Sequence, residues 1–473
     1  MAKVNGLVGP SSKQRSVPFN AERSINCFPV MDKHGKEVQS LYGTPGLSLF
    51  STGGIGPVRG CFYSTNGRAF YVSSNSLYEV TSAGISTIVG TLTTATNTIV
   101  EMEENGFQLA ICDGLKLYIF TYATNAFVKV TDPDLPSAAT LTFIDGYFVV
   151  SQVNAGTFYI SALYDGTSWA ALQFATAESS PDNLVRVLNA AGGSLWLLGS
   201  KTGEIWQNTG QSPFPFTRIS GAKMEVGILA ANTAIAIDNT IFWVGQDNIG
   251  SGIVFRAQGF TPSRISTNAI ELLIQAAPTP STLRAFTYQQ EGHVFYVITG
   301  GGMDTTLVYD ISTQMWHERA YLNAVGQFEL HLASCGMYAF NKFIVGDRTN
   351  GNIYVMSQDV FTDNGREIAM ERTFTHLSDQ NQRIIFSDLT IGVEVGDGLQ
   401  SGQGSDPLIT LYLSRDGGRS WSGGKQGSIG RVGQYRIRSI FRRLGQARIM
   451  TFRIRISDPI KRAITGCYLN VGD

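Results

Sequence analysis

The sequence predicts an all-β protein, built as a β-propeller with seven blades favoured and six as the alternative, followed by a C-terminal β-sandwich domain. Two observations carry this prediction. Pairs of short strands recur at an interval typical of propeller blades. After residue 385, the pattern changes to separate strands in which apolar and polar residues alternate.

Composition agrees with a large β-protein. The chain has 473 residues, of which 43% are hydrophobic, and 52 glycines accompany 11% aromatic residues, a mixture that favours many strands joined by tight turns. The net charge of −1 gives no general argument for binding to nucleic acid or to a membrane. Residues 386–473 nevertheless hold 13 Lys and Arg against 7 Asp and Glu, so basic charge gathers near the C-terminal end.

The repeat shows most clearly in Gly292–Trp316, where two β-rich runs flank the turn Gly300–Gly302. A single hairpin of this kind leaves both edges unpaired and requires neighbours. The chain supplies seven copies at spacings of 40 to 54 residues, each with an apolar strand before a strand that carries a central aromatic residue: Tyr78, Tyr118, Tyr159, Trp206, Phe255, Tyr309 and Tyr354. We assign residues 53–376 to the propeller.

Residues 1–52 are predicted to form an N-terminal arm and a latch strand. The first 20 residues are polar and rich in Gly and Ser, which indicates an extended segment. Gly43, Pro45 and Gly46 then enforce a turn before the strand Leu47–Phe50. This strand is predicted to complete the last blade and so to latch the ring.

One segment, Arg264–Ile274, has the pattern of a helix. Asn268 is the expected N-cap, with Glu271 three residues later. We expect a short helix that fills a connection between two blades.

Residues 377–473 are predicted to form the sandwich domain. Within Met450–Ile456, Phe452 and Ile454 alternate with Arg453 and Arg455, which indicates one buried and one polar face. A set of such strands favours a β-sandwich. The expected strands are Ile385–Glu394, Leu408–Ser414, Gln434–Phe441, Ile449–Ile456 and Thr465–Val471.

One motif in this domain matches the Asp-box of sialidase-type propellers. Ser414, Asp416, Gly418 and Trp421 fit its pattern of serine, aspartate, glycine and tryptophan. The aspartate of such a box accepts backbone N–H groups and its glycine takes a positive φ, so we interpret the box as a structural turn. A sialidase-like hydrolase would need several boxes inside the propeller, and this one occurs once, outside the repeats.

Other signatures of chemistry are missing from the sequence, so no catalytic residue, cofactor or metal site is predicted. There is no nucleophile elbow or Walker A loop. The histidines, His34, His293, His317, His331 and His376, lack metal-ligand spacing. The cysteines, Cys27, Cys61, Cys112, Cys335 and Cys467, are expected to be reduced, buried thiols. Neither a signal peptide nor a run long enough to span a membrane is present.

The region 431–462 contains nine arginines and one lysine, and Asp458 is its only acidic residue. One interpretation is a solvated strand face. The other is a surface that contacts an acidic protein partner or lies near DNA. The residues predicted for that contact are Arg436, Arg438, Arg442, Arg443, Arg453 and Arg455.

Several segments together resemble a known family. They are Asn20-Ala-Glu-Arg-Ser-Ile-Asn-Cys-Phe-Pro29 with the turn Tyr42–Leu47, the string Ile265–Glu271, the box at 414–421, Arg442-Arg-Leu-Gly445, and the arginine-rich strand that enters Ser457-Asp-Pro459. This combination resembles the packaged-DNA stabilisation proteins of short-tailed podovirus phages, which are also described as tail accessory factors, tail hub proteins or head completion proteins.

The resemblance implies a structural virion protein and not an enzyme. It implies a homo-hexameric ring in the short tail, assembled in the host cytoplasm, which lies below the portal and its adaptor ring and keeps the packaged DNA inside. Expected partners are the adaptor and portal, a tail needle or plug, and a tailspike or fibre, with non-specific contact to packaged DNA. The alternative is a monomeric propeller that binds a receptor or glycan at the tail tip.

Overall fold

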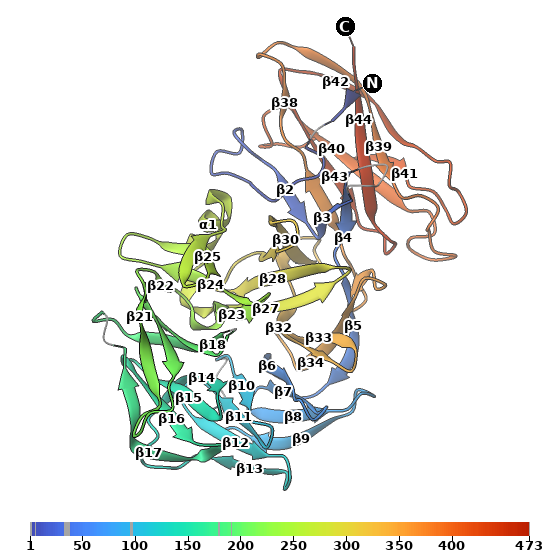
Figure 1. Ribbon diagram of the computed structural model, residues 1–473. Helices are drawn as coiled ribbons and strands as arrows, with labels where there is room; N and C mark the ends of the chain where they lie inside the picture. The colour runs from blue at the N-terminus through green and yellow to red at the C-terminus, as the bar shows by residue number, and fades with distance from the viewer. Residues whose placement is uncertain are drawn as a thin grey trace.

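The computed structural model describes residues 2–4, 6–32, 38–94, 98–177, 180–190 and 192–472. A ring of small sheets forms one end of the molecule, and a β-sandwich forms the other (Figure 1). Both chain termini lie at the sandwich end. The predicted fold class, a propeller with a C-terminal sandwich, is confirmed.

The described residues form seven blades, the larger of the two predicted numbers. The first four blades each contain four antiparallel strands that follow one another along the chain. Their strands are β6 (Val58–Tyr63), β7 (Ala69–Ser73), β8 (Ser76–Val80) and β9 (Ser86–Thr91); β10 (Glu101–Glu104), β11 (Gln108–Cys112), β12 (Leu117–Thr121) and β13 (Ala126–Lys129); β14 (Ala138–Ile144), β15 (Tyr147–Gln152), β16 (Thr157–Ala162) and β17 (Asp165–Thr176); β18 (Leu184–Ala190), β19 (Ser194–Gly199), β20 (Gly203–Asn208) and β21 (Phe216–Met224).

The last three blades depart from this simple order. In the fifth, two short strands share one neighbour, and in the seventh, the fourth strand comes from the N-terminal part of the chain. Their strands are β22 (Gly227–Ile228), β23 (Ile235–Ile237), β24 (Thr240–Gln246), β25 (Ser251–Gln258) and β26 (Thr261–Arg264); β27 (Leu283–Gln290), β28 (His293–Gly300), β29 (Thr306–Asp310) and β30 (Met315–Leu322), extended by β31 (Phe328–Leu330); and β32 (Ala333–Ala339), β33 (Lys342–Asp347) and β34 (Asn352–Ser357) with β5 (Gly46–Thr52).

The ring closes through its inner strands. The inner strand of each blade contacts that of the next, and β6 of the first blade contacts β32 of the seventh. The second and third strands of each blade carry the apolar runs seen in the sequence, and they are buried because adjacent blades cover both of their faces. Closure removes the exposed edges that an isolated hairpin would have.

Strand β5 latches the ring as predicted. It pairs antiparallel with β34, with Leu49 opposite Tyr354 and Leu47 opposite Met356. Leu47 is 1% exposed and belongs to the core shared by the last two blades. Gly46 is required at its start, because a Cβ there would lie 2.3 Å from the carbonyl oxygen of Val360.

The predicted helix is α1 (Asn268–Gln275), which lies between the fifth and sixth blades, with the 3-10 turn η2 (Pro280–Thr282) after it; a second 3-10 turn, η1 (Ala231–Thr233), lies inside the fifth blade. The predicted cap was wrong by one residue: Thr267 is the N-cap and makes no side-chain cap hydrogen bond. Glu271 is instead held by Arg264 and by the hydroxyl of Ser266, so the local ion pair replaces the capping box.

Two sheets form the sandwich. One has the order β3-β4-β44-β39-β42, with β1 beside β44, and the other continues β2-β37-β43-β40-β41, with β38 beside β43. Their strands are β1 (Ala2–Lys3), β2 (Arg23–Ile25), β3 (Cys27–Met31), β4 (Gln39–Gly43), β37 (Met370–Thr373), β38 (Leu377–Ser378), β39 (Ile384–Val393), β40 (Leu408–Ser414), β41 (Lys425–Ser428), β42 (Ser439–Ala447), β43 (Ile449–Ile456) and β44 (Ala463–Gly472).

The N-terminal segment is not the extended arm that its composition indicated. Val4, Leu7, Cys27 and Leu41 lie in the sandwich core beside side chains from β39, β42 and β43. Strands β1 and β4 pair with β44, β2 pairs with β37, and β3 extends the first sheet beyond β4. The described parts of residues 2–43 therefore complete the sandwich, and the propeller is inserted between its N- and C-terminal strands.

Four of the five predicted sandwich strands lie within two residues of the observed ones at each end, and β40 and β43 match at both ends. The strand predicted at Gln434–Phe441 is wrong at its start: residues 432–436 form turns, and β42 begins at Ser439. The predicted domain limits at 52 and 376 stay a prediction. The short strands β35 (Thr362–Asp363) and β36 (Arg366–Glu367) lie between the two domains.

One continuous sheet joins the two domains. Strand β2 pairs parallel with β30 of the sixth blade through Ile25 and Glu318, and antiparallel with β37 of the sandwich. The sixth blade and one sandwich sheet are therefore a single eleven-stranded sheet. Backbone hydrogen bonds thus fix the sandwich to the propeller.

Candidate interaction surface

The six arginines predicted as contacts fall into two groups. Arg436, Arg438, Arg442 and Arg443 are exposed, the first two in the turns before β42 and the others on β42 itself. Within the described residues none of these four makes an ion pair. We call these four residues the basic rim. Their charges are thus available to a partner.

A β-bulge explains how Arg442 and Arg443 both reach solvent. Adjacent residues of a regular strand point to opposite faces. Here the register between β39 and β42 shifts, with Arg442 opposite Asp388 and Gly445 opposite Phe386. Arg443 takes a φ of 58° at this shift. The extra residue turns both guanidinium groups outward while Phe441 and Leu444 stay buried.

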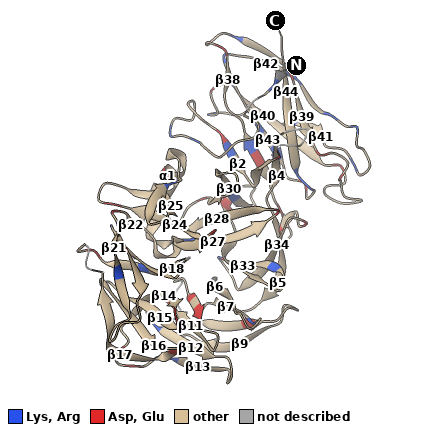
Figure 2. Ribbon diagram, in the orientation of Figure 1, with Lys and Arg blue, Asp and Glu red and all other residues tan. Residues whose placement is uncertain are grey.

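Arg453 and Arg455 belong instead to the junction between the domains. Both lie on β43 and face Glu371 of β37, at 3.3 Å and 3.8 Å. Arg453 stacks on the ring of Trp421 at 3.8 Å, and Arg455 lies 5.0 Å from the ring of Phe328. Charges of both signs gather where β2 and β43 approach β30 (Figure 2). These two arginines are engaged within the chain.

The Asp-box forms the turn between β40 and β41. Asp416 accepts backbone N–H groups from Arg419 and Ser420, both at 3.0 Å, and the hydroxyl of Ser414. Ser414 in turn accepts the N–H of Gly418, whose φ is 90°. The hydroxyl of Ser420 also donates to Asp416, and it acts with these hydrogen bonds to hold the pKa of Asp416 below its usual value. The turn presents Trp421 to Arg453, which links the box to the junction.

A buried ion pair crosses the junction. Arg23 of β2 forms two hydrogen bonds with Glu318 of β30, and Ser11 donates to the same carboxylate at 2.9 Å. Burial raises the pKa of Glu318, but the charge and hydrogen bonds of Arg23 outweigh it, so the net shift is downward. Glu318 is therefore an ionised carboxylate inside the molecule.

Arg372 of β37 anchors the N-terminal segment. Its side chain is fully buried and donates to the carbonyl oxygens of Gly6, Leu7 and Pro10 at 2.7 to 3.0 Å, and to Glu22 at 3.1 Å. Burial lowers its pKa. A single guanidinium thus replaces the strand partners that this irregular backbone lacks.

Two further buried arginines hold the two segments in which the chain passes from one domain to the other. Arg462 donates to the carbonyl oxygen of Ile368 at 2.6 Å, and Arg319 donates to that of Pro45 at 2.8 Å. Burial lowers the pKa of Arg462 to about 10. Both connecting segments are therefore held by hydrogen bonds from arginine side chains at the junction.

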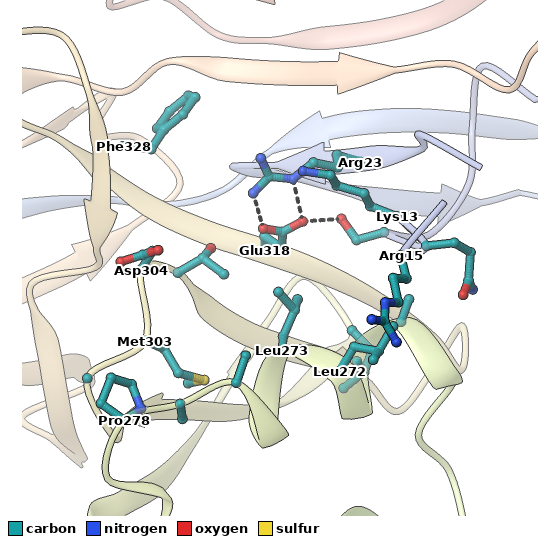
Figure 3. A pocket seen from close by; sticks show the side chains of 18 residues that line it. Lys13, Arg15, Arg23, Leu272, Leu273, Pro278, Met303, Asp304, Glu318 and Phe328 are labelled. Atoms are coloured by element: carbon teal, nitrogen blue, oxygen red, sulfur yellow. Dashed lines mark hydrogen bonds and ion pairs between the residues drawn. The ribbon is translucent and has the colours of Figure 1, made fainter. Parts of the chain in front are cut away.

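A cleft of about 660 Å³ opens beside the junction, between α1 and the segment 11–15 (Figure 3). Leu272 and Leu273, each 38% exposed, form its apolar wall with Met303. Lys13 and Arg15 also line the cleft, and burial together with Arg23 lowers the pKa of Lys13. The cleft was not foreseen, although α1 has more apolar residues than a single buried stripe accommodates.

A second cavity, of about 200 Å³, lies at the centre of the propeller and is lined by inner strands from all seven blades. Glu101 of β10 forms an ion pair with Arg186 of β18. Burial, followed by the charge of Glu104, raises the pKa of Glu103 to about 8. We call this cavity the propeller channel; it is also lined by Arg284, Cys61 and Cys335.

The structure offers no group of three or more His, Cys, Asp or Glu residues that could hold a metal ion among the described residues. His34 lies outside the described residues. His293 contacts Asp310 at 2.7 Å, and His317 is buried with its pKa lowered by burial to about 3. Among the helices described, none is long and apolar enough to cross a membrane.

Two family models match the chain. The bacteriophage P22 Gp10 β-propeller matches residues 7–361, and the bacteriophage P22 Gp10 β-sandwich matches residues 369–472. The chain belongs to the bacteriophage P22 Gp10 family. It is therefore a phage tail structural protein with a β-propeller. No curated protein matches the chain.

Solved structures with some likeness to this P22 Gp10 family member include virginiamycin B lyase from Staphylococcus aureus, at 10% identity and a TM-score of 0.43, which covers 64% of this chain and 94% of the lyase. The WD40 domain of Neurospora crassa Pan2 has 8% identity and a TM-score of 0.43, over 66% of this chain and 95% of that domain. At these values the likenesses carry no argument about function.

Proposed function

We propose that the chain forms a homo-oligomeric ring, of six copies, in the short tail below the portal and adaptor. In this proposal the ring closes the DNA channel, retains the packaged DNA and bears the needle or plug and the tailspike or fibre. Its role is structural and involves no bond chemistry. Membership of the P22 Gp10 family supports this role.

The observation that carries the proposal is that the basic rim is held in a fixed orientation relative to the propeller. Four arginines that form no ion pair with any described residue are exposed on β42 and in the turns before it. The eleven-stranded sheet fixes them relative to the propeller. A positive surface held in one orientation favours docking to an acidic partner surface and speeds the encounter. We place the contact with the adaptor here, with head-to-tail contacts closing the ring.

Attachment to DNA-filled heads tests this placement. Replacing Arg442 and Arg443 together by Glu reverses the two outward charges at the bulge. We expect attachment, measured by co-sedimentation with heads that carry portal and adaptor, to weaken by at least about tenfold, because like charges then face each other. Raising the salt concentration should weaken attachment of the unmodified protein in the same direction.

A matched control variant reverses the same number of positive charges at a different place on the protein surface. Lys129→Glu with Lys201→Glu alters the same number of exposed charges on the second and fourth blades, away from the sandwich. This variant should attach normally. Unimpaired attachment of the Arg442→Glu, Arg443→Glu variant would remove the proposed contact. A protein that binds host glycan and ignores portal complexes would favour a receptor-binding propeller instead.

A further inference from the structure

We propose that Cys61 and Cys335 form a redox-active dithiol site that closes as a disulfide across the seam between the first and seventh blades. The assignment rests on geometry and does not depend on the proposed function. Sequence composition predicted five buried thiols, and for Cys27, Cys112 and Cys467 this is correct. Cys61 and Cys335 differ, because both are partly exposed and line the propeller channel.

The two sulfur atoms are already in contact. Cys61 lies on β6 and Cys335 on β32, and their Sγ atoms are 3.2 Å apart, although 274 residues separate them in sequence. A disulfide has an S–S distance of about 2.05 Å, so the sulfurs need to approach by roughly 1 Å. Small side-chain rotations on the two neighbouring inner strands supply a movement of this size.

The surroundings favour reaction at Cys335. The hydrogen bond from the Cys61 thiol lowers the pKa of Cys335, and the nearby guanidinium of Arg284 acts in the same direction. The hydroxyl of Ser334 also points to this sulfur, at 3.8 Å. A thiolate is the reactive form of cysteine in disulfide exchange, and cationic, partly exposed sites promote it. Cys335 is thus the attacking sulfur and Cys61 the resolving one.

The oxidant is a low-molecular-weight disulfide. The Cys335 thiolate attacks one sulfur of oxidised glutathione and forms a mixed disulfide while one glutathione thiolate leaves. Cys61 loses its proton to that thiolate, attacks the Cys335 sulfur and releases the second glutathione as a thiolate, which takes from water the proton that the Cys335 thiol gave up when it ionised. Two protein thiols and one oxidised glutathione thereby become one protein disulfide and two reduced glutathiones.

The position of the bond gives it a structural effect. β6 and β32 meet where the ring closes, and the seventh blade already depends on β5 for its outer strand. A disulfide here joins inner strands at the same seam that β5 latches from outside. It encloses a loop of more than 270 residues, the case in which a cross-link restricts the unfolded chain most.

Oxidation of the purified full chain tests the site. After incubation with oxidised glutathione, we expect thiol titration in denaturant to fall from five free thiols to three. Peptide mapping under non-reducing conditions should show one peptide pair that links Cys61 to Cys335. The melting temperature should rise by about 5–10 °C and return to its starting value on reduction.

Single variants separate this pair from the other cysteines. Cys61→Ser and Cys335→Ser should each abolish the cross-linked peptide and the rise in melting temperature. Cys112→Ala removes a buried thiol in the second blade and should preserve both. Retention of all five thiols by the unmodified protein, stable glutathione adducts without an internal bond, or cross-links between molecules would each overturn the assignment.

Discussion

The propeller and the sandwich solve the same problem, the pairing of β-strand edges, in opposite ways. In the first four blades each strand pairs with its neighbour in sequence, and the cores are apolar side chains packed between adjacent sheets. The sandwich combines strands from both ends of the chain. Where its backbone is irregular, buried arginines replace missing strand partners, as Arg372 does. The blades thus rely on apolar burial between neighbouring sheets, and the sandwich adds buried charged anchors to its own apolar core.

The largest effect should come from removing the anchor of the sandwich. Arg372→Ala leaves Glu22 and three carbonyl oxygens without their donor inside the molecule. We expect a loss of about 3–5 kcal/mol in the free energy of unfolding of the sandwich. Hydrogen exchange measured by mass spectrometry should increase in residues 6–31 and stay unchanged in the second to fourth blades.

Arg438→Ala is the matched control, because Arg438 is an exposed arginine of the same domain. It should leave exchange unchanged. Equal exchange in all blades and in residues 6–31 of the Arg372→Ala variant would show that the two domains unfold as one unit, and the contrast between them would then fail.

The contribution of apolar burial to the stability of the propeller is tested at the latch strand β5. Leu47→Ala shortens a side chain that is 1% exposed in the core of the last two blades, and should cost about 2–4 kcal/mol of propeller stability. Leu49→Ala changes the same residue type on the same strand, where it is 53% exposed. Chemical denaturation followed by tryptophan fluorescence should separate the two, and equal midpoints would argue against a latch role for β5.

The smallest expected effect is a change in how the folding stability depends on pH, caused by Glu318 at the junction. The folded pKa of Glu318 lies below its unfolded value of about 4.5, so its stabilisation is complete above about pH 5 and is lost as the pH falls through the folded pKa. Glu318→Gln should remove roughly 1–2 kcal/mol at pH 7 and flatten the dependence on pH below 5. Denaturation midpoints between pH 7 and pH 4 measure this.

Glu225→Gln serves as the control, since the Glu225 side chain is 75% exposed and forms an ion pair with Lys223 at the surface. Its pH dependence should match that of the unmodified protein. An unchanged slope in Glu318→Gln would mean that the ion pair with Arg23 does not distinguish the folded from the unfolded chain.

The difference between the domains also explains what the sequence could predict. Blade strands such as Leu195–Leu197 are apolar runs beside turns, and their partners follow within a few residues, so the repeat was predictable. Strand β2 spans only three residues, and its partners Glu318 and Arg372 lie about 300 residues away. No local sequence pattern predicts such distant pairing, and the composition of the first 20 residues therefore indicated an extended arm.

The candidate site was predictable to the same extent. The charge count located the basic segment, but the alternation of Arg453 and Arg455 gave no sign that Glu371 would face them. The exposure of Arg443 depends on a bulge, whose register shift appears only when β39 is paired. The contact between Cys61 and Cys335 depends on ring closure, which brings together the two ends of the repeat array.

Insertion of the propeller between strands of the sandwich has a consequence for synthesis. Blades can fold in order on the nascent chain, because domains form as units while translation proceeds. β37 and β39 to β44 leave the ribosome after the propeller, so β1, β2 and β4 lack their partners in the sandwich until those strands have been translated. The surface that carries the basic rim therefore forms only after β42 has been translated, and products truncated before β42 lack it.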